Sequence, residues 1–525
     1  LRQNLAFITE GLNFRSVLNT TRNAFFEISR KYNPFWYQIV DKDLQNPGNY
    51  LFNVINPDGG TEYLDYDESS KSVSSVFYSE SALTYNRTFN EDHSVSGLLV
   101  YIMRNQLDGS AGSLQESLPY RNLGLSGRFT YDYANRYFAE FNFGYNGSER
   151  FYKSNRFGFF PAFGLAWSVS NEPFWESIKE TISNFRIRAT YGLVGNDAIG
   201  SSTDRFYYLS EINMNSTDRA ASFGLEKNYT RNGISITRYS NPDISWETSY
   251  KTNLALDIGL FGKVDLTTDF FYERRTNMFM SRANIPTTMG LAVTTAANVG
   301  EAEGKGVDIS LNYSHMFPNR DIWIQGLANF TYAASKYLKY EEPIYPESWM
   351  SRVGTPISAT WGYLAERLFI DDEEVANSPA QDFGTFRGGD LKFKDLNGDF
   401  VINEIDRVPL GFPTTPEINY GFGLSSGYKN VDFSVFFQGS ARSSFWISTS
   451  ATAPFNRYVY SGETVPSNVI LVNQLLKAYA DSYWSEDNQD IYALWPRLST
   501  SSIMTGTTTN SWFMRDGSFL RLKQM

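Results

Sequence analysis

The sequence predicts an all-β protein, a transmembrane antiparallel β-barrel, from three observations. Apolar and polar side chains alternate over many segments of about ten residues, the length that a tilted strand needs to cross a bilayer. Aromatic residues make up 16% of the 525 residues and charged residues only 20%, so the chain has enough apolar material to fold. Short turns alternate with long polar connections, which is typical of membrane barrels.

Alternation with a period of two recurs along the whole chain, and about sixteen strands are expected from it. The clearest segments are residues 123–133, 137–145, 185–193, 248–260, 264–273, 418–424 and 431–437. Their apolar face is expected to meet lipid, and it includes Leu125, Phe129, Tyr131, Phe141, Phe143, Leu254, Leu256, Ile258, Phe433 and Val435. Their polar face is expected to line the lumen, with Arg128, Glu140, Arg186, Arg188, Lys251 and Asp257 as candidates.

The connections between these segments differ in length. Tight turns are predicted at 134–136, 261–263 and 427–430. Long polar loops are predicted at 106–121, 195–245, 274–304, 336–416 and 441–510. Because an outer-membrane barrel has short turns on one side and long loops on the other, the long connections are expected to be extracellular.

Composition excludes several classes of function. The chain has no Cys and two His, so zinc fingers, thiol nucleophiles and disulfide scaffolds are ruled out. The net charge of −11 argues against nucleic-acid binding, which needs a basic surface. A soluble multi-sheet β protein is the alternative fold, since its strands also alternate.

Segments spread along the chain resemble the SusC/RagA-type TonB-dependent outer-membrane transporters of Bacteroidota. The segments that carry this resemblance include GFFPAFGLAWSVSNEPFW (158–175), FRIRATYGLVGND (185–197), NPDISWETSYKTNLALDIGLF (241–261), GDLKFKDLNGDFVINEIDRVPLG (389–411) and WFMRDGSFLRLKQM (512–525). They follow the order of the family and cover essentially the whole chain.

The resemblance implies that residues 1–525 are part of a 22-stranded barrel, with the N-terminal plug domain and the last strands missing from this chain. It also implies an outer-membrane protein that is not an enzyme. The expected function is TonB-dependent import of a bulky nutrient, an oligosaccharide in preference to an oligopeptide. The expected partners are outer-membrane lipid, TonB acting through the missing plug, and a SusD-like surface lipoprotein that forms a lid. A dimer of transporter–lipoprotein pairs is a further expectation.

Two other functions remain open at this point. The chain could be a transporter-derived scaffold subunit of a larger outer-membrane complex. It could also be a secreted multi-sheet carbohydrate-active enzyme or adhesin, although no catalytic motif accompanies its many carboxylates.

One segment has the spacing of a calcium loop. Oxygen-bearing side chains occupy loop positions that ligate calcium, and a backbone carbonyl is available at the seventh position. The candidate ligands are Asp395, Asn397, Asp399, Val401 and Asp406. No other cofactor is expected. Phe400 stands where such loops have Gly, and Asp406 is shorter than the usual Glu. The alternative is a turn-rich loop whose Asx side chains bond their own backbone.

The long loops also contain an acidic run and several aromatic residues. The run 371–374 is expected to be a solvated face. Aromatic residues of the loops are expected to be exposed and to contact substrate or partner, and the candidates are Tyr207, Tyr208, Trp361, Trp446 and Trp484.

Overall fold

A fifteen-stranded antiparallel sheet dominates the computed structural model, which describes residues 1–525 except 43–47, 202–203, 319–320, 456, 460–469 and 500–508. The strands of this sheet are β1 (Arg2–Asn4), β2 (Leu12–Lys31), β5 (Asp65–Phe89), β6 (His93–Asp108), β7 (Tyr120–Tyr133), β8 (Tyr137–Ser148), β9 (Phe157–Ser168), β10 (Ile182–Asn196), β13 (Glu247–Leu260), β14 (Val264–Ser281), β15 (Ala296–Phe317), β16 (Ile322–Lys339), β23 (Ile418–Tyr428), β24 (Val431–Ala441) and β29 (Phe519–Gln524). Each strand pairs with the next member of this series.

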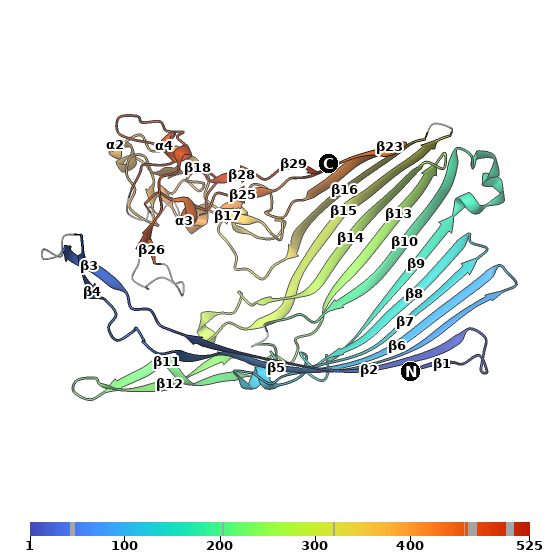
Figure 1. The fold of residues 1–525 in the computed structure, drawn as a ribbon, viewed down its shortest axis with the longest axis horizontal. Helices are drawn as coiled ribbons and strands as arrows, with labels where there is room; N and C mark the ends of the chain where they lie inside the picture. Colours follow the sequence, from blue (N-terminus) through green and yellow to red (C-terminus); the bar gives the residue numbers. More distant parts are fainter. Residues whose placement is uncertain (43–47, 202–203, 319–320, 456, 460–469, 500–508) are drawn as a thin grey trace.

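The sheet curls into a trough whose first and last strands lie at opposite borders (Figure 1). Within the described part of the chain, β1 and β29 pair on one side only. The prediction of an antiparallel barrel wall is confirmed. Among the described residues, no helix has the length and apolarity that crossing a membrane would require.

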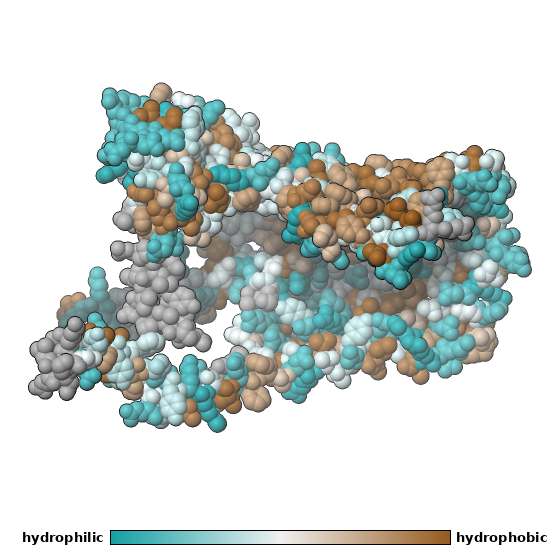
Figure 2. Space-filling view, turned by 45° about the horizontal axis from the view of Figure 1, so that its top comes forward, coloured by the Kyte–Doolittle hydropathy of each residue, from teal (hydrophilic) through white to brown (hydrophobic). Residues whose placement is uncertain are grey.

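The two faces of the sheet differ as the alternation predicts. Phe129, Leu165 and Leu254 are among the large apolar side chains that project into solvent from the convex face. Figure 2 shows such apolar side chains gathered over the strands, with hydrophilic residues at the turns. Successive side chains of a strand point to opposite faces, so the polar residues between them line the concave face.

Most connections at one end of the sheet are tight turns. Ala134 and Asn135 between β7 and β8, and Phe261 and Gly262 between β13 and β14, all have positive φ. Such left-handed residues give a turn the twist that joins two antiparallel strands closely. The turn after β23 is shorter than the predicted range and contains only Lys429 and Asn430. The connection between β9 and β10 is longer and holds the 3-10 helices η1 (Val169–Asn171) and η2 (Pro173–Ile178).

The other end carries the long connections, and several strands run further into them than the sequence predicts. The loop predicted at 274–304 is confined to residues 282–295, where η3 (Thr287–Met289) lies. Strands β5 and β15 are 25 and 22 residues long, well beyond the expected ten. The remaining elements at this end are the hairpin β3 (Tyr37–Lys42) with β4 (Tyr50–Val54), the hairpin β11 (Glu211–Phe223) with β12 (Tyr229–Arg238), and α1 (Leu114–Ser117).

Two long loops fold together into a unit that we call the cap, made of the described residues of 340–417 and 442–518. Figure 1 shows it above the long-loop end of the sheet. Its elements are η4 (Ser348–Met350), β17 (Thr360–Gly362), β18 (Ala365–Leu368), α2 (Asp372–Ala376), β19 (Ala380–Gln381), β20 (Leu391–Phe393), β21 (Val401–Ile402), η5 (Glu404–Asp406), β22 (Val408–Leu410), β25 (Ser444–Trp446), α3 (Thr449–Thr452), β26 (Arg457–Val459), β27 (Ile470–Val472), α4 (Lys477–Ala480) and β28 (Met514–Asp516).

The cap has a hydrophobic core of its own. Side chains from both loops meet in it, among them Leu368, Leu391 and Phe393 from the first loop and Trp495 and Phe513 from the second. Because a buried apolar side chain contributes about 1.5–3 kcal/mol, this core holds the two loops together although they are separated by β23 and β24.

Candidate functional site

The concave face of the sheet carries paired charges on β7, β8, β10, β13 and β14. Arg128 on β7 reaches across to Glu140 on β8, with Nε–Oε1 and Nη2–Oε2 distances of 3.1 and 2.9 Å. Asn142 donates a further hydrogen bond of 2.6 Å to the same carboxylate. A bidentate ion pair of this kind holds both side chains in one geometry, because the two guanidinium N–H groups match the two carboxylate oxygens.

A second network joins β10 to β13 and β14. Arg186 and Arg188 both bond Asp257, with their Nε atoms 3.1 and 2.9 Å from Oδ2. Arg188 also lies 3.6 Å from Asp269 on β14. Further along β13 and β14, toward the long loops, Lys251 lies 3.5 Å from Glu273.

Small residues of β9 separate these two networks and leave a groove of about 760 Å³ between them. Ala162, Gly164 and Ala166 pair with β8 on one side and with β10 on the other. Since they project little or nothing from the concave face, the longer side chains of Arg128 and Arg188 form the walls of the groove.

The sequence placed all six lumen candidates on one face, and the structure pairs each of them with an opposite charge. Their partners Asp269 and Glu273 were not among the candidates, although both lie on the polar face of the alternating segment 264–273. Strand periodicity could have found them, because Glu273 stands directly opposite Lys251 in the register.

The loop aromatics take several positions. Trp484 is only 7% exposed and lies in the core of the cap, so the expectation that it is exposed is wrong. Trp446 is half-buried and donates its indole N–H to the carbonyl of Asn510. Trp361, also half-buried, lies on β17 with Arg352 above its ring.

Tyr207 and Tyr208 lie at the rim, away from the cap core. Tyr207 packs edge-on against Phe279 with ring centroids 4.6 Å apart. Tyr208 lies 5.9 Å from the ring of Tyr152, which is 38% exposed. The predicted residue Tyr208 and its neighbour Tyr152, which the sequence did not single out, therefore form two neighbouring rings with access to solvent.

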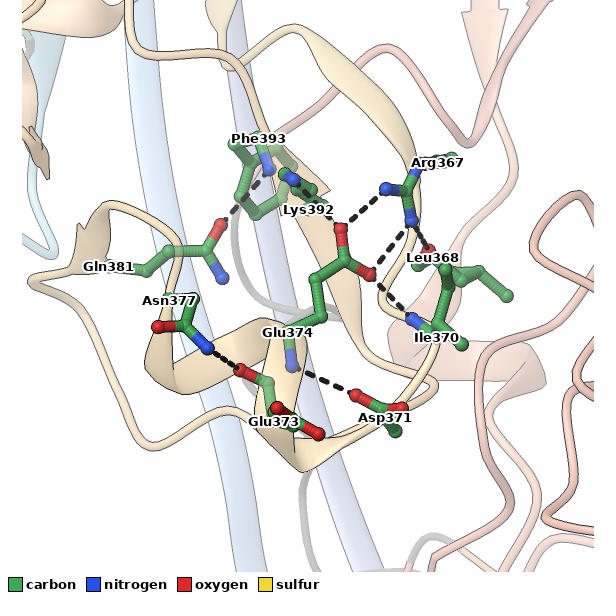
Figure 3. Close-up of polar contacts among 10 residues, drawn as sticks. All are labelled: Arg367, Leu368, Ile370, Asp371, Glu373, Glu374, Asn377, Gln381, Lys392 and Phe393. Carbon is green, nitrogen blue, oxygen red and sulfur yellow. Dashed lines mark hydrogen bonds and ion pairs between the residues drawn. The ribbon is translucent and has the colours of Figure 1, made fainter.

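The acidic run 371–374 is a structural feature of the cap rather than a solvated face throughout. Asp371 caps helix α2 by accepting the N–H of Glu374 at 2.8 Å. The carboxylate of Glu374 turns inward, where it bonds the side chains of Arg367 and Lys392 and the backbone N–H of Ile370 (Figure 3). Burial acts to raise the pKa of Glu374, but these partners outweigh it and hold the pKa at about 2.

The depressed pKa of Glu374 predicts a pH-dependent stability of the cap. A carboxyl with a folded-state pKa of about 2 and an ordinary value of 4.5 stabilises the folded state above pH 4.5. That contribution is lost as pH falls from about 4.5 to 2. We expect Glu374→Gln to lower the stability of the cap by about 2–3 kcal/mol at pH 7. Hydrogen exchange of the cap amides, corrected for intrinsic rates, measures this. A difference between the variant and the parent that stays constant from pH 7 to 2 would contradict the assignment.

The candidate calcium loop is closed by bonds to its own backbone. Asp395 accepts the N–H groups of Gly398 and Phe400 at 2.7 and 2.9 Å. Asp399 accepts the N–H of Val401 at 2.8 Å and the side-chain amide of Asn397 at 2.9 Å. These are the Asx bonds of the alternative interpretation. In the described part of the chain, no group of three acidic or imidazole side chains is placed to hold a metal ion. Calcium binding therefore stays a prediction without geometric support.

Asp406 is the structural centre of this loop. It is fully buried and accepts the N–H groups of Leu396 and Asn403 at 2.8 and 2.9 Å. We expect Asp406→Ala to destabilise the cap by about 2–4 kcal/mol, because two donors lose their acceptor in a buried position. Hydrogen exchange of residues 391–410 provides the measurement. Asp399→Ala, at the exposed tip of the loop, is the matched control and should cost less than 1 kcal/mol. Equal losses in the two variants would disprove the central role of Asp406.

A curved antiparallel wall with an apolar convex face, charged networks on its concave face and long loops at one end has the architecture of an outer-membrane β-barrel. The chain belongs to the family described as TonB dependent receptor-like, beta-barrel, whose model matches residues 3–496. Its place is thus the outer membrane, and like its relatives it is not an enzyme.

Similar proteins come from Bacteroidota. TonB-dependent receptor P3 of Formosa agariphila is 27% identical over 420 residues, which cover 73% of this chain and 40% of that protein. TonB-dependent receptor SusC of Bacteroides thetaiotaomicron is 26% identical over 362 residues, covering 66% and 33%. The chain thus spans about two fifths or less of the length of these curated relatives.

Solved structures share the fold. The RagAB peptide transporter superposes with a TM-score of 0.64 at 18% identity, covering 98% of this chain and 53% of the matched chain. The resemblance found in the sequence is confirmed by the family match and by this common architecture.

Proposed function

We propose that the full-length protein imports a bulky nutrient across the outer membrane in a TonB-dependent manner. The observation that carries the proposal is membership of the receptor-barrel family over residues 3–496, in a chain whose concave face is lined by charges. Charges that are paired and held by their neighbours keep a lumen hydrated and offer both donors and acceptors to a polar solute.

The proposed nutrient is an oligosaccharide in preference to an oligopeptide. Sugar hydroxyls both donate and accept hydrogen bonds, so they match a wall where guanidinium and carboxylate groups alternate, as at Arg128 and Glu140. The neighbouring rings of Tyr152 and Tyr208 at the rim offer flat apolar faces to a sugar. An oligopeptide is the second candidate, favoured by the fold shared with the RagAB peptide transporter.

The proposed partners are TonB, on the periplasmic side, and a SusD-like surface lipoprotein, over the long loops. The cap supports the lipoprotein as a partner, because a unit with its own hydrophobic core offers a rigid surface to which a second protein can bind. The alternative role, as a scaffold subunit of a larger outer-membrane complex, would use the same surface without transport.

Uptake by whole cells tests the proposal. Fluorescently labelled oligosaccharides and oligopeptides of equal length are offered to cells with the gene, without it, and with the gene but without TonB. We expect oligosaccharide uptake only when both the gene and TonB are present. Uptake of peptides alone would overturn the substrate class. Loss of an outer-membrane complex in the deletion strain, with no change in uptake, would overturn the transport function in favour of the scaffold.

A further inference from the structure

A second pocket, of about 360 Å³, lies at the long-loop end of the concave face, and we call it the arginine pocket. Strands β6 and β7, the loop after β8, and the residues Asp197, Arg205 and Phe206 surround it. Four arginines are among its lining residues, namely Arg104, Arg121, Arg150 and Arg205. This concentration of positive charge is local, since the whole chain has a net charge of −11.

In the part of the chain that the structure describes, three of these arginines have only neutral hydrogen-bond partners. Arg104 donates to the side chain of Gln106 at 2.8 Å. Arg150 donates to the backbone carbonyls of Asp197 and Ile199 at 2.9 and 3.2 Å. No carboxylate of the described residues lies within ion-pair distance of Arg104, Arg150 or Arg205. This contrasts with the wall below, where each candidate arginine has a carboxylate partner.

Arg205 is the most unusual member of the set. It is 1% exposed, its side chain donates hydrogen bonds to the carbonyls of Gln115 and Leu118, and its Nε atom has no partner among the described residues. The guanidinium carbon lies 3.6 Å from the ring centroid of Tyr120. A buried cation is costly unless an opposite charge compensates it, and here the protein supplies carbonyl dipoles and a ring face instead.

The remaining charges of the pocket are fewer. Arg121 is matched by Glu149 at 3.6 Å. Asp108 and Asp197 also lie in the lining, and Asp108 accepts the N–H of Ser110 at 2.9 Å. Two carboxylates thus face three arginines that lack an ion-pair partner, so the pocket keeps an excess of positive charge.

We infer that the arginine pocket binds an oxyanion group, a carboxylate or a sulfate, carried by the imported oligomer, so that the substrate is an acidic oligosaccharide. This inference rests on the proposed function. Arg104 is exposed and Arg150 half-buried, so their guanidinium groups are accessible for contact, while buried Arg205 supplies a fixed charge behind them. A pocket of this volume holds a sugar-sized group rather than a bare ion. The tyrosine pair 152 and 208 lies on the same two loops, which favours a sugar over an acidic peptide.

Direct binding to the purified full-length protein in detergent tests the inference. The probes are oligogalacturonate, its carboxyl-reduced neutral counterpart, an oligoglutamate of similar length, and sodium sulfate. We expect oligogalacturonate to bind most tightly, and Arg104→Gln with Arg150→Gln to weaken it roughly 10- to 100-fold without changing the neutral probe. Asp197→Asn, which removes an opposing charge, should strengthen binding by about threefold.

A matched control removes the same charge elsewhere. Arg219→Gln with Arg231→Gln changes two exposed arginines of the β11–β12 hairpin and should leave all affinities unchanged. The heat-dependent gel mobility of each variant verifies that the barrel has folded. Equal weakening by the control pair, or binding of the neutral probe as tight as that of the acidic one, would overturn the inference.

The other probes separate the possible ligands. Tighter binding of oligoglutamate would replace the acidic sugar by an acidic peptide, and sulfate binding as tight as that of the oligomer would indicate a free anion; either result overturns the inference. Uptake separates its failure from that of the proposed function. If neutral oligosaccharides enter in a TonB-dependent manner while acidic ones neither bind nor enter, only the acidic substrate class is wrong.

Discussion

Replacing Arg497 with Met is expected to destabilise the cap by about 3–5 kcal/mol. The carboxylate of Asp390 is 1% exposed and meets Arg497 through an Oδ1–Nε distance of 2.9 Å and an Oδ2–Nη2 distance of 3.1 Å. Burial raises the pKa of Asp390, although Arg497 and Arg387 favour its charged form. Without Arg497, a charge remains buried, and the backbone N–H of Arg387 still donates a hydrogen bond to it at 2.9 Å.

Hydrogen exchange across both loops of the cap measures this effect. Protection of residues 360–410, 477–499 and 509–516 should fall together, by a factor of about a hundred or more, since the ion pair joins one loop to the other. The loss should be smaller at pH 5 than at pH 7.5, because the unpaired Asp390 is easier to protonate at lower pH.

An exposed ion pair of the same cap provides the control for this experiment. Arg407 pairs with Glu404, whose side chain is 77% exposed, so Arg407→Met should cost no more than about 1 kcal/mol. A loss in Arg497→Met no larger than in this control would show that the buried pair does not join the loops.

The strands were predictable where lipid meets one face of the sheet. Residues 248–260 were predicted as a strand, and β13 spans Glu247–Leu260. The signal is local there, because apolar side chains must point outward at every second position. Beyond the lipid zone both faces are polar and the alternation disappears, although the backbone continues to pair. Arg274 bonds Glu301 at 2.7 Å within the range 274–304, which the sequence alone presents as a loop.

The cap and the arginine pocket were not predictable from local patterns. Trp484 is buried against Leu391 and Phe393, about ninety residues earlier in the chain, and no short-range pattern reveals that contact. Likewise, Glu374 belongs to an acidic run that has the sequence pattern of a solvated surface. Its partners Lys392 and Arg367 are brought to it by the fold of the cap. Arg205 is a single arginine in a polar loop, and its importance comes from the carbonyls of residues 115 and 118. Contacts between distant loops determine both features.

Placing an arginine on the convex face is expected to damage the barrel far more than placing it on the concave face. Leu254 lies in the middle of β13, is 47% exposed, and stands between Ala189 and Phe270 on the neighbouring strands. In a membrane its side chain meets lipid, so we expect Leu254→Arg to cost about 2–4 kcal/mol near the bilayer midplane. Urea titration of the full-length protein folded into lipid vesicles measures the cost.

Thr190→Arg is the matched substitution on the concave face. Thr190 stands directly opposite Asn253, next to Leu254 in the chain, but it points into the groove and is exposed. Its replacement places the same charge at the same depth within reach of water, so the expected cost is close to zero. Equal destabilisation by the two substitutions would mean that the faces are reversed or that β13 does not cross the membrane. A large loss of stability for Leu254→Arg alone would show that lipid meets the convex face. The charged networks of Arg128 and Arg188 would then lie on the inside of the barrel, where the proposed transport requires them.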